Sequence, residues 1–296
     1  MKAVVLTGHG DVDKLELREL PDPEPGAGEA LVKVLATSVN AVDWKIRRGA
    51  FPTPLPEVLG RDVAGEVVKV GAGVTSVRPG ERVMGMARHA WAELVVVKAD
   101  DLAKIPPGLD LEQAAALPLV ATTGAELIEE HTRPEEGETV LVTGAVGGVG
   151  RAAVYAAKQR GARVLAGVRR SQKKEAAKLD VDGVVAIDDD AEIAKLPELD
   201  AIADTVSGET IQKLLPHLKR GGRLGSVLGE PPGAKARGLQ VEAFMAHPDG
   251  PRLARLAAAA VRHELVIPIG RRLPLAQVAQ ANRLAEGGAG KVVLTT

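Results

Sequence analysis

The sequence predicts an α/β protein of two domains, in which a β-rich, barrel-like domain precedes a doubly wound parallel sheet. The chain has 296 residues, about twice the length of a typical domain, and 45% of them are hydrophobic, which suffices for two packed cores. Short Val- and Leu-rich runs separated by Gly and Pro fill the N-terminal part. After Leu111, strands alternate with helices, the order that builds a parallel sheet with right-handed crossovers.

The N-terminal part is expected to form antiparallel strands. Its apolar runs are AVVL, LVKVLATSV, VAGEVVKVG, ERVMGMA and WAELVVVK. Two proline-rich stretches, 21–30 and 49–60, are expected to connect strands, because proline cannot sit in a central strand.

The alternating part is expected to begin with a helix over 111–131 that breaks at Pro118. Strands are predicted at 138–143, 163–168, 183–187, 199–206 and 222–228. Helices are predicted at 151–160, 171–179 and 209–220. A helix over 275–286 and an apolar strand over 291–295 close the chain.

Composition excludes several classes of protein. Lys and Arg (38) balance Asp and Glu (39), and two Phe, two Trp and one Tyr are too few to stack bases, so nucleic-acid binding is not expected. The absence of cysteine rules out disulfides and Cys-ligated metals. We find neither a secretory signal nor a run of apolar residues long enough for a membrane span. We therefore expect a cytoplasmic protein with no membrane partner.

A glycine-rich turn between a predicted strand and a predicted helix is the sharpest local pattern. Glycines let the backbone approach a pyrophosphate closely, and the first amides of a helix bind its charge. The pattern predicts a dinucleotide site; the alternative is a purely structural connection. The residues assigned to the pyrophosphate are Gly144, Ala145, Val146, Gly147, Gly148, Val149 and Gly150.

The residues after the next predicted strand indicate which dinucleotide binds. An NAD site carries Asp or Glu there for the ribose hydroxyls, whereas this chain reads RRSQKK over 169–174. Basic side chains bind a 2′-phosphate, which a carboxylate would repel. The sequence therefore predicts NADPH, held by Arg169 and Arg170. The alternative is a solvated first helical turn, although basic residues there oppose the helix dipole.

Six segments of the chain carry a family likeness. They are NAVDWKIRRG, LGRDVAGEVVKVGAGVTSVRPGERV, WAELVVV, AAALPLVATTGAEL, VLVTGAVGGVG and GKVVL. In order and spacing they resemble the medium-chain dehydrogenase/reductase superfamily, and within it the zinc-free quinone oxidoreductase branch related to ζ-crystallin. The resemblance implies a GroES-like catalytic domain, residues 1–117 and 266–296, and a Rossmann domain, residues 118–265, that binds NADPH. It also implies that the last strand joins the catalytic domain.

The resemblance also bears on metals. Zinc-dependent relatives place Cys and His-Glu ligands where this chain has Asn40 and Arg61-Asp62, and neither asparagine nor arginine suits catalytic zinc. We therefore predict no metal. Histidines occur at positions 9, 89, 131, 217, 247 and 263 without ligand spacing, and we expect them to be surface or capping residues.

Further cofactor contacts are implied by the resemblance. Thr123 matches a threonine near the nicotinamide ribose, and Lys173 matches a lysine that meets the 2′-phosphate. The ends of two predicted strands meet the nicotinamide side in the family, and open α/β sheets bind ligands there. The residues at those ends are Asp204, Val206, Val227, Leu228 and Gly229. For Asp204, the alternative is a cap of the helix that begins near Gly208.

Asn40, Asp43 and Lys45 are the candidate catalytic residues, because the resemblance places them in the family's cleft. Many relatives have a tyrosine where this chain has Lys45. Lys45 either bonds a cofactor or substrate oxygen or is simply solvated. Trp44 either walls the pocket or packs in the core.

The resemblance implies NADPH-dependent hydride transfer to a quinone. Without a metal, hydride transfer is easiest to an acceptor that is already electrophilic. The quinone ring or the β-carbon of an enone receives the hydride, backbone amides or Asn40 stabilise the oxygen anion, and solvent supplies the proton. The alternatives are an NADPH-dependent alkenal or enone C=C reductase and a non-catalytic, crystallin-like NADPH-binding protein.

The family often dimerises through an edge strand of its Rossmann sheet. The apolar segment 263–269 is predicted to be that edge, with a buried strand as the alternative. We therefore expect a homodimer.

Overall fold

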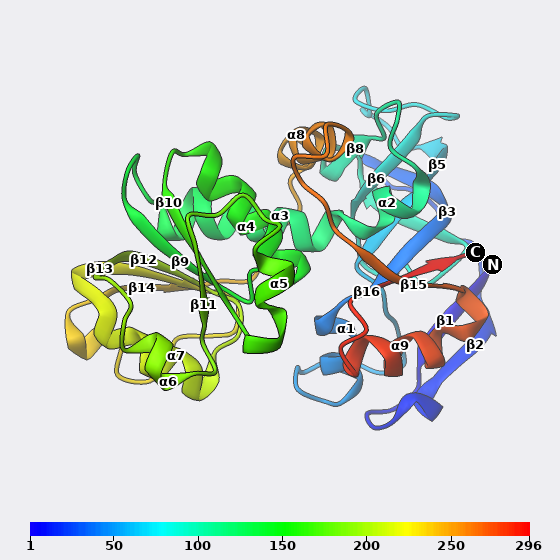
Figure 1. Ribbon diagram of the computed structural model, residues 1–296. Coiled ribbons are helices and arrows are strands. Elements are labelled where there is room, and N and C mark those ends of the chain that lie inside the picture. The colour runs from blue at the N-terminus through cyan, green and yellow to red at the C-terminus, as the bar shows by residue number, and fades with distance from the viewer. The chain divides into compact units, whose positions relative to one another are not determined.

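The computed structural model describes residues 1–296, which form two compact units (Figure 1). Unit 1 contains Met1–Leu119 and Pro248–Thr296, and unit 2 contains Val120–His247. Unit 1 consists mainly of antiparallel strands, and unit 2 is built on a parallel sheet, so the predicted fold class is confirmed. None of the helices combines the length and the apolar character that crossing a bilayer requires.

Unit 1 holds two sheets. The smaller has the strand order β2-β1-β4, and the larger has the order β15-β16-β3-β5-β6-β8, with β7 also paired to β3. The strands are β1 (Lys2–Leu6), β2 (Leu15–Glu19), β3 (Glu29–Val39), β4 (Glu57–Val58), β5 (Asp62–Val70), β6 (Arg82–Met86), β7 (Leu94–Lys98), β8 (Leu102–Lys104), β15 (Ile269–Pro274) and β16 (Lys291–Thr295). The long β3 pairs with β5, β7 and β16 and therefore runs through the centre of the sheet.

The core of unit 1 consists of two apolar clusters. One contains valines of β3, β5, β6 and β7, and the other surrounds the fully buried Trp91. The indole Nε1 of Trp91 donates to the carbonyl of Ser38 at 3.1 Å, so its polar edge is satisfied inside the core. Trp91 is therefore a core residue that also holds the end of β3.

The C-terminal strand β16 lies antiparallel to β3, with Val292 opposite Val39. Val292, Val293 and Leu294 are fully buried in unit 1. The expected return of the last strand to the first domain is confirmed.

Four α-helices lie in unit 1: α1 (Ala41–Arg47), α2 (Leu111–Ala116), α8 (Gly250–Val261) and α9 (Val278–Glu286). The carboxylates of Asp110 and Asp249 cap α2 and α8 by accepting backbone N–H groups at 2.8 and 2.7 Å. Short 3-10 turns are η1 (Val12–Lys14), η2 (Ala99–Asp101) and η7 (Leu275–Gln277).

Helix α8 corrects the predicted domain boundary. It packs on β8 and η2, so the chain re-enters unit 1 at Pro248 and not near residue 266. A Cβ added at Gly250 would lie 2.4 Å from the carbonyl oxygen of Asp100, so the helix starts in direct backbone contact with this unit. The apolar side of α8, with Leu253 and Leu256, is buried. Amphipathic spacing predicts such a side but not which domain it covers.

Unit 2 contains one six-stranded parallel sheet with the order β11-β10-β9-β12-β13-β14. Its strands are β9 (Thr139–Thr143), β10 (Arg163–Val168), β11 (Gly183–Ala186), β12 (Leu199–Asp204), β13 (Leu218–Ser226) and β14 (Gln240–Ala243). The chain moves outward from β9 to β11 and then crosses back to β12, beside β9. The order reverses there, which makes the carboxyl ends of β9 and β12 the expected ligand crevice.

Helices cover both faces of this sheet (Figure 1). They are α3 (Pro118–Glu126), α4 (Gly148–Gln159), α5 (Lys173–Ala176), α6 (Asp190–Ile193) and α7 (Gly208–Leu214), with the π-helix η3 (Leu127–Thr132) and the 3-10 turns η4 (Arg170–Gln172), η5 (Leu215–His217) and η6 (Lys235–Arg237). The predicted helix break at Pro118 is present between α2 and α3. Helix α4 packs against η3, whereas Ile211 and Leu214 of α7 share a core with Leu141 and Ile202.

The edge of the parallel sheet differs from the prediction. The outer strand is β14, whereas 263–268 follows α8 in unit 1 and forms no strand. In unit 1, Leu265 and Ile267 are buried and Val266 is exposed, so this apolar segment packs beside α8 and is not a sheet edge of unit 2. The homodimer itself stays a prediction.

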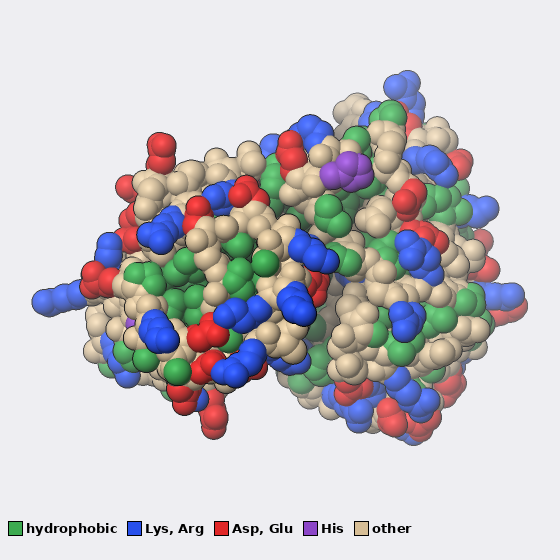
Figure 2. Space-filling model, in the orientation of Figure 1, with side chains coloured by type: hydrophobic (Ala, Val, Ile, Leu, Met, Phe, Trp, Pro, Cys, Tyr) green, Lys and Arg blue, Asp and Glu red, His purple; other side chains and the backbone are tan.

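Acidic and basic side chains are interspersed on the face shown in Figure 2. This distribution agrees with the formal net charge of −1. That face shows no large patch of basic side chains alone, which a nucleic-acid-binding surface would need. The exclusion of nucleic acid and the cytoplasmic location stay predictions.

Candidate active site

The glycine-rich turn connects β9 to α4 in unit 2. Gly144 has φ of +63°, a left-handed conformation that glycine adopts without strain. A Cβ added at Gly150 would lie 2.2 Å from the carbonyl oxygen of Gly144, so only glycine allows α4 to start this close to the turn. Gly147 is exposed, has φ of −74° and precedes α4 without a side-chain cap.

This turn fits a pyrophosphate. The first helical hydrogen bond of α4 runs from the Arg151 amide to the carbonyl of Gly147, four residues back, at 2.8 Å. The amides of Gly148, Val149 and Gly150 precede that bond and belong to the first helical turn, whose N–H groups have no acceptor within the helix. Ala145 is buried, and the carbonyl of Val146 accepts a hydrogen bond from Arg151 Nε at 2.9 Å. The turn therefore presents amides and no carboxylate to a ligand.

A buried polar network ties together the carboxyl ends of β9, β12 and β13. Asp204 is fully buried; one of its oxygens accepts from Thr143 Oγ1 at 3.0 Å and the other from Ser226 Oγ at 2.9 Å. The first oxygen also accepts the amides of Val206 and Ser207, at 3.1 and 3.0 Å. The carboxylate of Asp204 thus shapes the loop before α7, which is close to the capping role considered as the alternative.

Apolar side chains are exposed beside this network. Val206 and Leu228, at the ends of β12 and β13, are each 39% exposed. Val227 is half-buried, and Gly229 has open space where a Cβ would be. The Thr123 side chain, on α3, is largely buried. An exposed apolar bed at the ends of parallel strands suits a flat ring such as nicotinamide.

The three predicted 2′-phosphate residues differ in their partners. Lys173 Nζ lies 2.8 Å from both carboxylate oxygens of Glu192, and Arg170 pairs with Asp189. These cations lower the pKa values of Glu192 and Asp189, chiefly through side-chain hydrogen bonds. The side chain of Arg169 is exposed, and the hydrogen bonds of this residue are made by its backbone: the amide donates to Gln172 Oε1 at 3.2 Å and the carbonyl accepts the Gln172 amide at 2.8 Å. Arg169 is therefore the cation of this cluster whose charge no carboxylate offsets.

Unit 1 contains a separate buried polar cluster beneath the start of α1. One carboxylate oxygen of Asp62 accepts from Asn40 Nδ2 at 2.8 Å, from Lys291 Nζ at 2.9 Å and from Ser38 Oγ. The other oxygen accepts the Leu119 amide at 2.7 Å. Lys291 Nζ also donates to Asn40 Oδ1 at 2.6 Å. The Asp62 and Lys291 side chains are 0% and 6% exposed, so this is a buried ion pair with its hydrogen bonds in place.

The other predicted catalytic residues lie on α1. Asp43 is fully buried, and its Oδ2 accepts the Asn40 amide at 2.8 Å while its Oδ1 has no partner. Lys45 is half-buried, with Nζ 5.8 Å from the centre of the Trp44 ring. The two side chains therefore form a cation–π pair in unit 1.

Two family models match the sequence. A model described as "Alcohol dehydrogenase GroES-like domain" matches residues 26–107, and one described as "Zinc-binding dehydrogenase" matches 179–294. The acryloyl-coenzyme A reductase of Metallosphaera sedula is 33% identical over an alignment 253 positions long, which covers 76% of this chain and 75% of the relative. The chain belongs to the medium-chain dehydrogenase/reductase superfamily.

Solved structures agree over the full length of this dehydrogenase/reductase. The quinone oxidoreductase from Coxiella burnetii superimposes with a TM-score of 0.92 at 28% identity, covering 100% of this chain and 99% of that one. The Escherichia coli quinone oxidoreductase complexed with NADPH gives 0.88 at 25% identity, covering 100% of both. The protein is thus an oxidoreductase of the quinone oxidoreductase branch, as the resemblance implied.

The superfamily includes zinc enzymes, so we tested whether zinc fits this member. The resemblance matches the zinc-ligand positions of those relatives to Asn40, Arg61 and Asp62 of this chain. The ammonium group of Lys291 bonds both Asn40 and Asp62, at 2.6 and 2.9 Å. Asp62 is the one residue here of a type that zinc prefers, and its carboxylate is already paired with the Lys291 ammonium. An amide and a guanidinium do not supply the remaining imidazole, thiolate or carboxylate ligands. Zinc therefore does not fit this site, where Lys291 supplies the positive charge.

Sequence reasoning missed Lys291 as a member of the site. The only indication was a lysine at the start of an otherwise apolar strand, KVVL. Arg47 was missed as well: it is fully buried, and its Nε donates to Asn282 Oδ1 at 2.7 Å. This contact joins α1 to α9 and holds in place the helix that carries Asp43 and Lys45.

Asp43 should make the stability of this oxidoreductase depend on pH. Burial, opposed by the Asn40 amide and reinforced by the Asp62 charge, raises its pKa from 3.8 to about 7. The folded state therefore keeps a proton that the unfolded state loses as pH rises from about 4 to 7, and stability falls over that range by at most about 1.4 kcal/mol per pH unit.

The Asp43→Asn variant carries no charge and should lack this dependence. Urea unfolding at pH 5 and pH 8 is expected to show the variant gaining stability relative to the natural protein at the higher pH. If the difference in unfolding free energy between the variant and the natural protein is the same at pH 5 and pH 8, the raised pKa of Asp43 is contradicted.

Proposed function

We propose that the protein is an NADPH-dependent reductase that transfers hydride to a quinone. The observation that carries the proposal is the buried Lys291–Asp62–Asn40 cluster. The family resemblance matches Asn40 and Asp62 of this cluster to metal-ligand positions of zinc-dependent relatives. Such a site lacks the Lewis acid that activates an alcohol or a simple aldehyde. It therefore suits an acceptor that is already electrophilic and whose reduced form spreads its negative charge.

The residues of unit 2 supply the proposed NADPH site. The amides at the start of α4 bind the pyrophosphate, and Arg169, with Arg170 and Lys173 beside it, binds the 2′-phosphate. Thr123, Val206 and Leu228 border the nicotinamide ring. When bound, NADPH supplies the hydride.

The proposed acceptor site involves α1 and the residue before it. The side-chain amide nitrogen of Asn40 has two N–H groups, and its hydrogen bond to Asp62 uses one of them. The second N–H is available to the acceptor oxygen as negative charge develops there. Lys45, paired with Trp44, is a second donor on that helix. Solvent supplies the final proton.

Reduction of a conjugated C=C bond is a second candidate, favoured by the acryloyl-coenzyme A reductase relative. The same donors would stabilise the enolate oxygen of an enone or a thioester. A non-catalytic NADPH-binding protein is the third possibility, and it predicts binding without turnover.

NADPH consumption distinguishes these candidates. We expect oxidation with 1,4-benzoquinone and 9,10-phenanthrenequinone at rates well above those with a short alkenal or acryloyl-coenzyme A. Faster turnover of the alkenal or the thioester would assign the C=C reductase instead. Tight NADPH binding without turnover of any acceptor would favour the non-catalytic protein.

Changing Arg169 to aspartate should reverse the coenzyme preference. The variant loses a charge-assisted bond to the 2′-phosphate and gains a repulsive carboxylate, so NADPH affinity should fall by at least about tenfold while NADH affinity is retained or rises. Fluorescence titration with both dinucleotides measures the effect. The exposed Lys178 provides a matched control, Lys178→Asp, which should leave the preference unchanged. Equal use of both dinucleotides by the natural protein would refute the assignment.

A further inference from the structure

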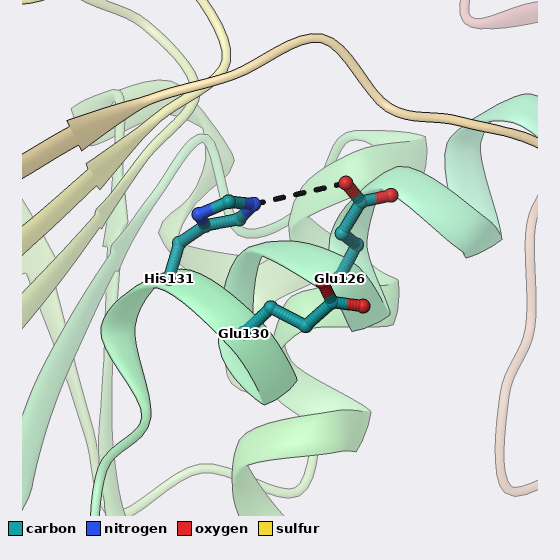
Figure 3. Close-up of side chains that lie close together, drawn as sticks. All are labelled: Glu126, Glu130 and His131. Carbon is teal, nitrogen blue, oxygen red and sulfur yellow. Dashed lines mark ion pairs between the residues drawn. The ribbon is translucent and has the colours of Figure 1, made fainter.

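We propose that Glu126, Glu130 and His131 of unit 2 form a binding site for a divalent transition-metal ion such as Zn²⁺. The three side chains offer ligand atoms that all lie within 4.8 Å of one another. Figure 3 shows the ring of His131 directed at the carboxylate of Glu126, with Glu130 beside them. None of these residues belongs to the glycine-rich turn or to the Lys291 cluster.

The π-helix brings these residues together. In an α-helix, with 3.6 residues per turn, His131 would point about 140° away from Glu126. In η3, a π-helix, the turn is wider: the Arg133 amide donates to the carbonyl of Ile128, five residues back, at 2.9 Å. The Thr132 hydroxyl also donates to the carbonyl of Leu127, at 2.9 Å. Residues five apart therefore share a face, and such wide turns are frequent at functional sites.

The ring of His131 is held in the orientation that a metal ligand needs. Its Nδ1 lies 2.8 Å from the carboxylate of Glu242, and the ring stacks on Phe244 with centroids 3.9 Å apart. A ring that donates its Nδ1 proton to Glu242 keeps a lone pair on Nε2. A carboxylate behind a histidine is the usual outer partner of a metal-bound imidazole.

The second nitrogen of His131 lacks a hydrogen-bond partner. Nε2 is buried and lies 3.7 Å from Glu126 Oε1, too far for a hydrogen bond. A buried nitrogen without a partner is costly, so it calls for an explanation. This observation is independent of the two glutamates, and it points into the space between the three side chains.

The separation of the donors suits a transition metal. Metal–nitrogen and metal–oxygen bonds near 2.1 Å at a tetrahedral angle place N and O about 3.4 Å apart, slightly less than the observed 3.7 Å. Two carboxylates and a neutral imidazole carry two negative charges, which match a divalent ion. Three protein ligands leave one position for water. His247, with Nδ1 3.0 Å from the same Glu126 oxygen, is a further imidazole within reach of that carboxylate.

The bound ion would have a structural role. It would link Glu126 at the end of α3 to η3 and, through Glu242, to the edge strand β14. The sequence predicted no metal, because asparagine and arginine occupy the zinc-ligand positions of the relatives and the histidines lack ligand spacing. The wide turn of η3 brings together a histidine and two glutamates that this spacing did not indicate.

Metal titration of the full-length protein tests the proposal. Protein stripped with a chelator is dialysed against Co²⁺ or Zn²⁺ at micromolar concentration, and bound metal is counted. We expect one ion per chain, displacement of Co²⁺ by Zn²⁺, and a rise in the thermal unfolding midpoint with Zn²⁺. Glu130→Gln and His131→Gln should each weaken binding at least about tenfold.

Matched variants separate this site from adventitious binding. Glu135→Gln and His217→Gln remove the same groups elsewhere in unit 2 and should bind metal like the natural protein. Should His131→Gln fail to fold, Glu130→Gln decides alone, because Glu130 is exposed. Absence of a bound ion, or equal affinity in Glu130→Gln and the natural protein, would overturn the proposal.

Discussion

Replacing Lys291 by methionine is expected to lower the free energy of unfolding by about 3–5 kcal/mol, because it leaves the fully buried carboxylate of Asp62 without its counter-charge. Methionine keeps most of the aliphatic volume, so the loss reports the charge and not a cavity. The amide of Asn40 also loses its donor, since Lys291 Nζ bonds Asn40 Oδ1 at 2.6 Å. Urea unfolding measures the effect.

Two further variants isolate the ion pair. Lys33 lies exposed on β3 of the same sheet, and Lys33→Met should change stability by less than about 0.5 kcal/mol. The double variant Asp62→Asn, Lys291→Met removes both charges and should cost less than the sum of its single changes. Additive losses would show that the two residues act independently, contrary to the observed contact.

Alanine substitutions at Gly150 and Gly147 are expected to separate folding from cofactor binding. At Gly150 the new Cβ would lie 2.2 Å from a backbone oxygen, so the start of α4 must shift, at a cost of about 1–3 kcal/mol and with loss of NADPH binding. At Gly147 the nearest atom is 3.2 Å away, φ is −74° and the position is exposed, so the fold should persist. The methyl group introduced by Gly147→Ala would instead meet the pyrophosphate of the proposed NADPH site.

Thermal unfolding and NADPH titration of both variants provide the test. Gly147→Ala should keep the unfolding midpoint of the natural protein and bind NADPH at least about tenfold more weakly, since a displaced phosphate loses charge-assisted bonds of roughly 1.5–3 kcal/mol. Unchanged NADPH affinity in Gly147→Ala would place the pyrophosphate elsewhere.

Elements with a strong local pattern were predicted well. The alternation of strands and helices after Leu111 led to the parallel sheet, and the glycines between β9 and α4 marked the turn. These patterns lie within short stretches of chain, where backbone sterics and the spacing of apolar residues determine the local structure. The boundary at α8 and the edge strand were wrong because an apolar side or segment does not reveal which surface covers it.

The polar partners could not be predicted in the same way. Asp62 and Lys291 are 229 positions apart, and nothing local to either residue indicates the other. The run 169–174 contains basic residues and no carboxylate, and from it the sequence predicted a 2′-phosphate site. The acids that pair with Arg170 and Lys173 lie further along the chain, at positions 189 and 192. Those contacts decide which cation is available to a phosphate.

The sequence alone predicted the two-domain α/β architecture, the family and the position of the glycine-rich turn, because each follows from patterns in contiguous residues. Folding in three dimensions was needed to bring Lys291 to Asn40 and Asp62 and to turn His131 toward Glu126. The physical reason is that charge pairing and burial depend on distances through space, which strand pairing and helix geometry set, and not on distances along the chain.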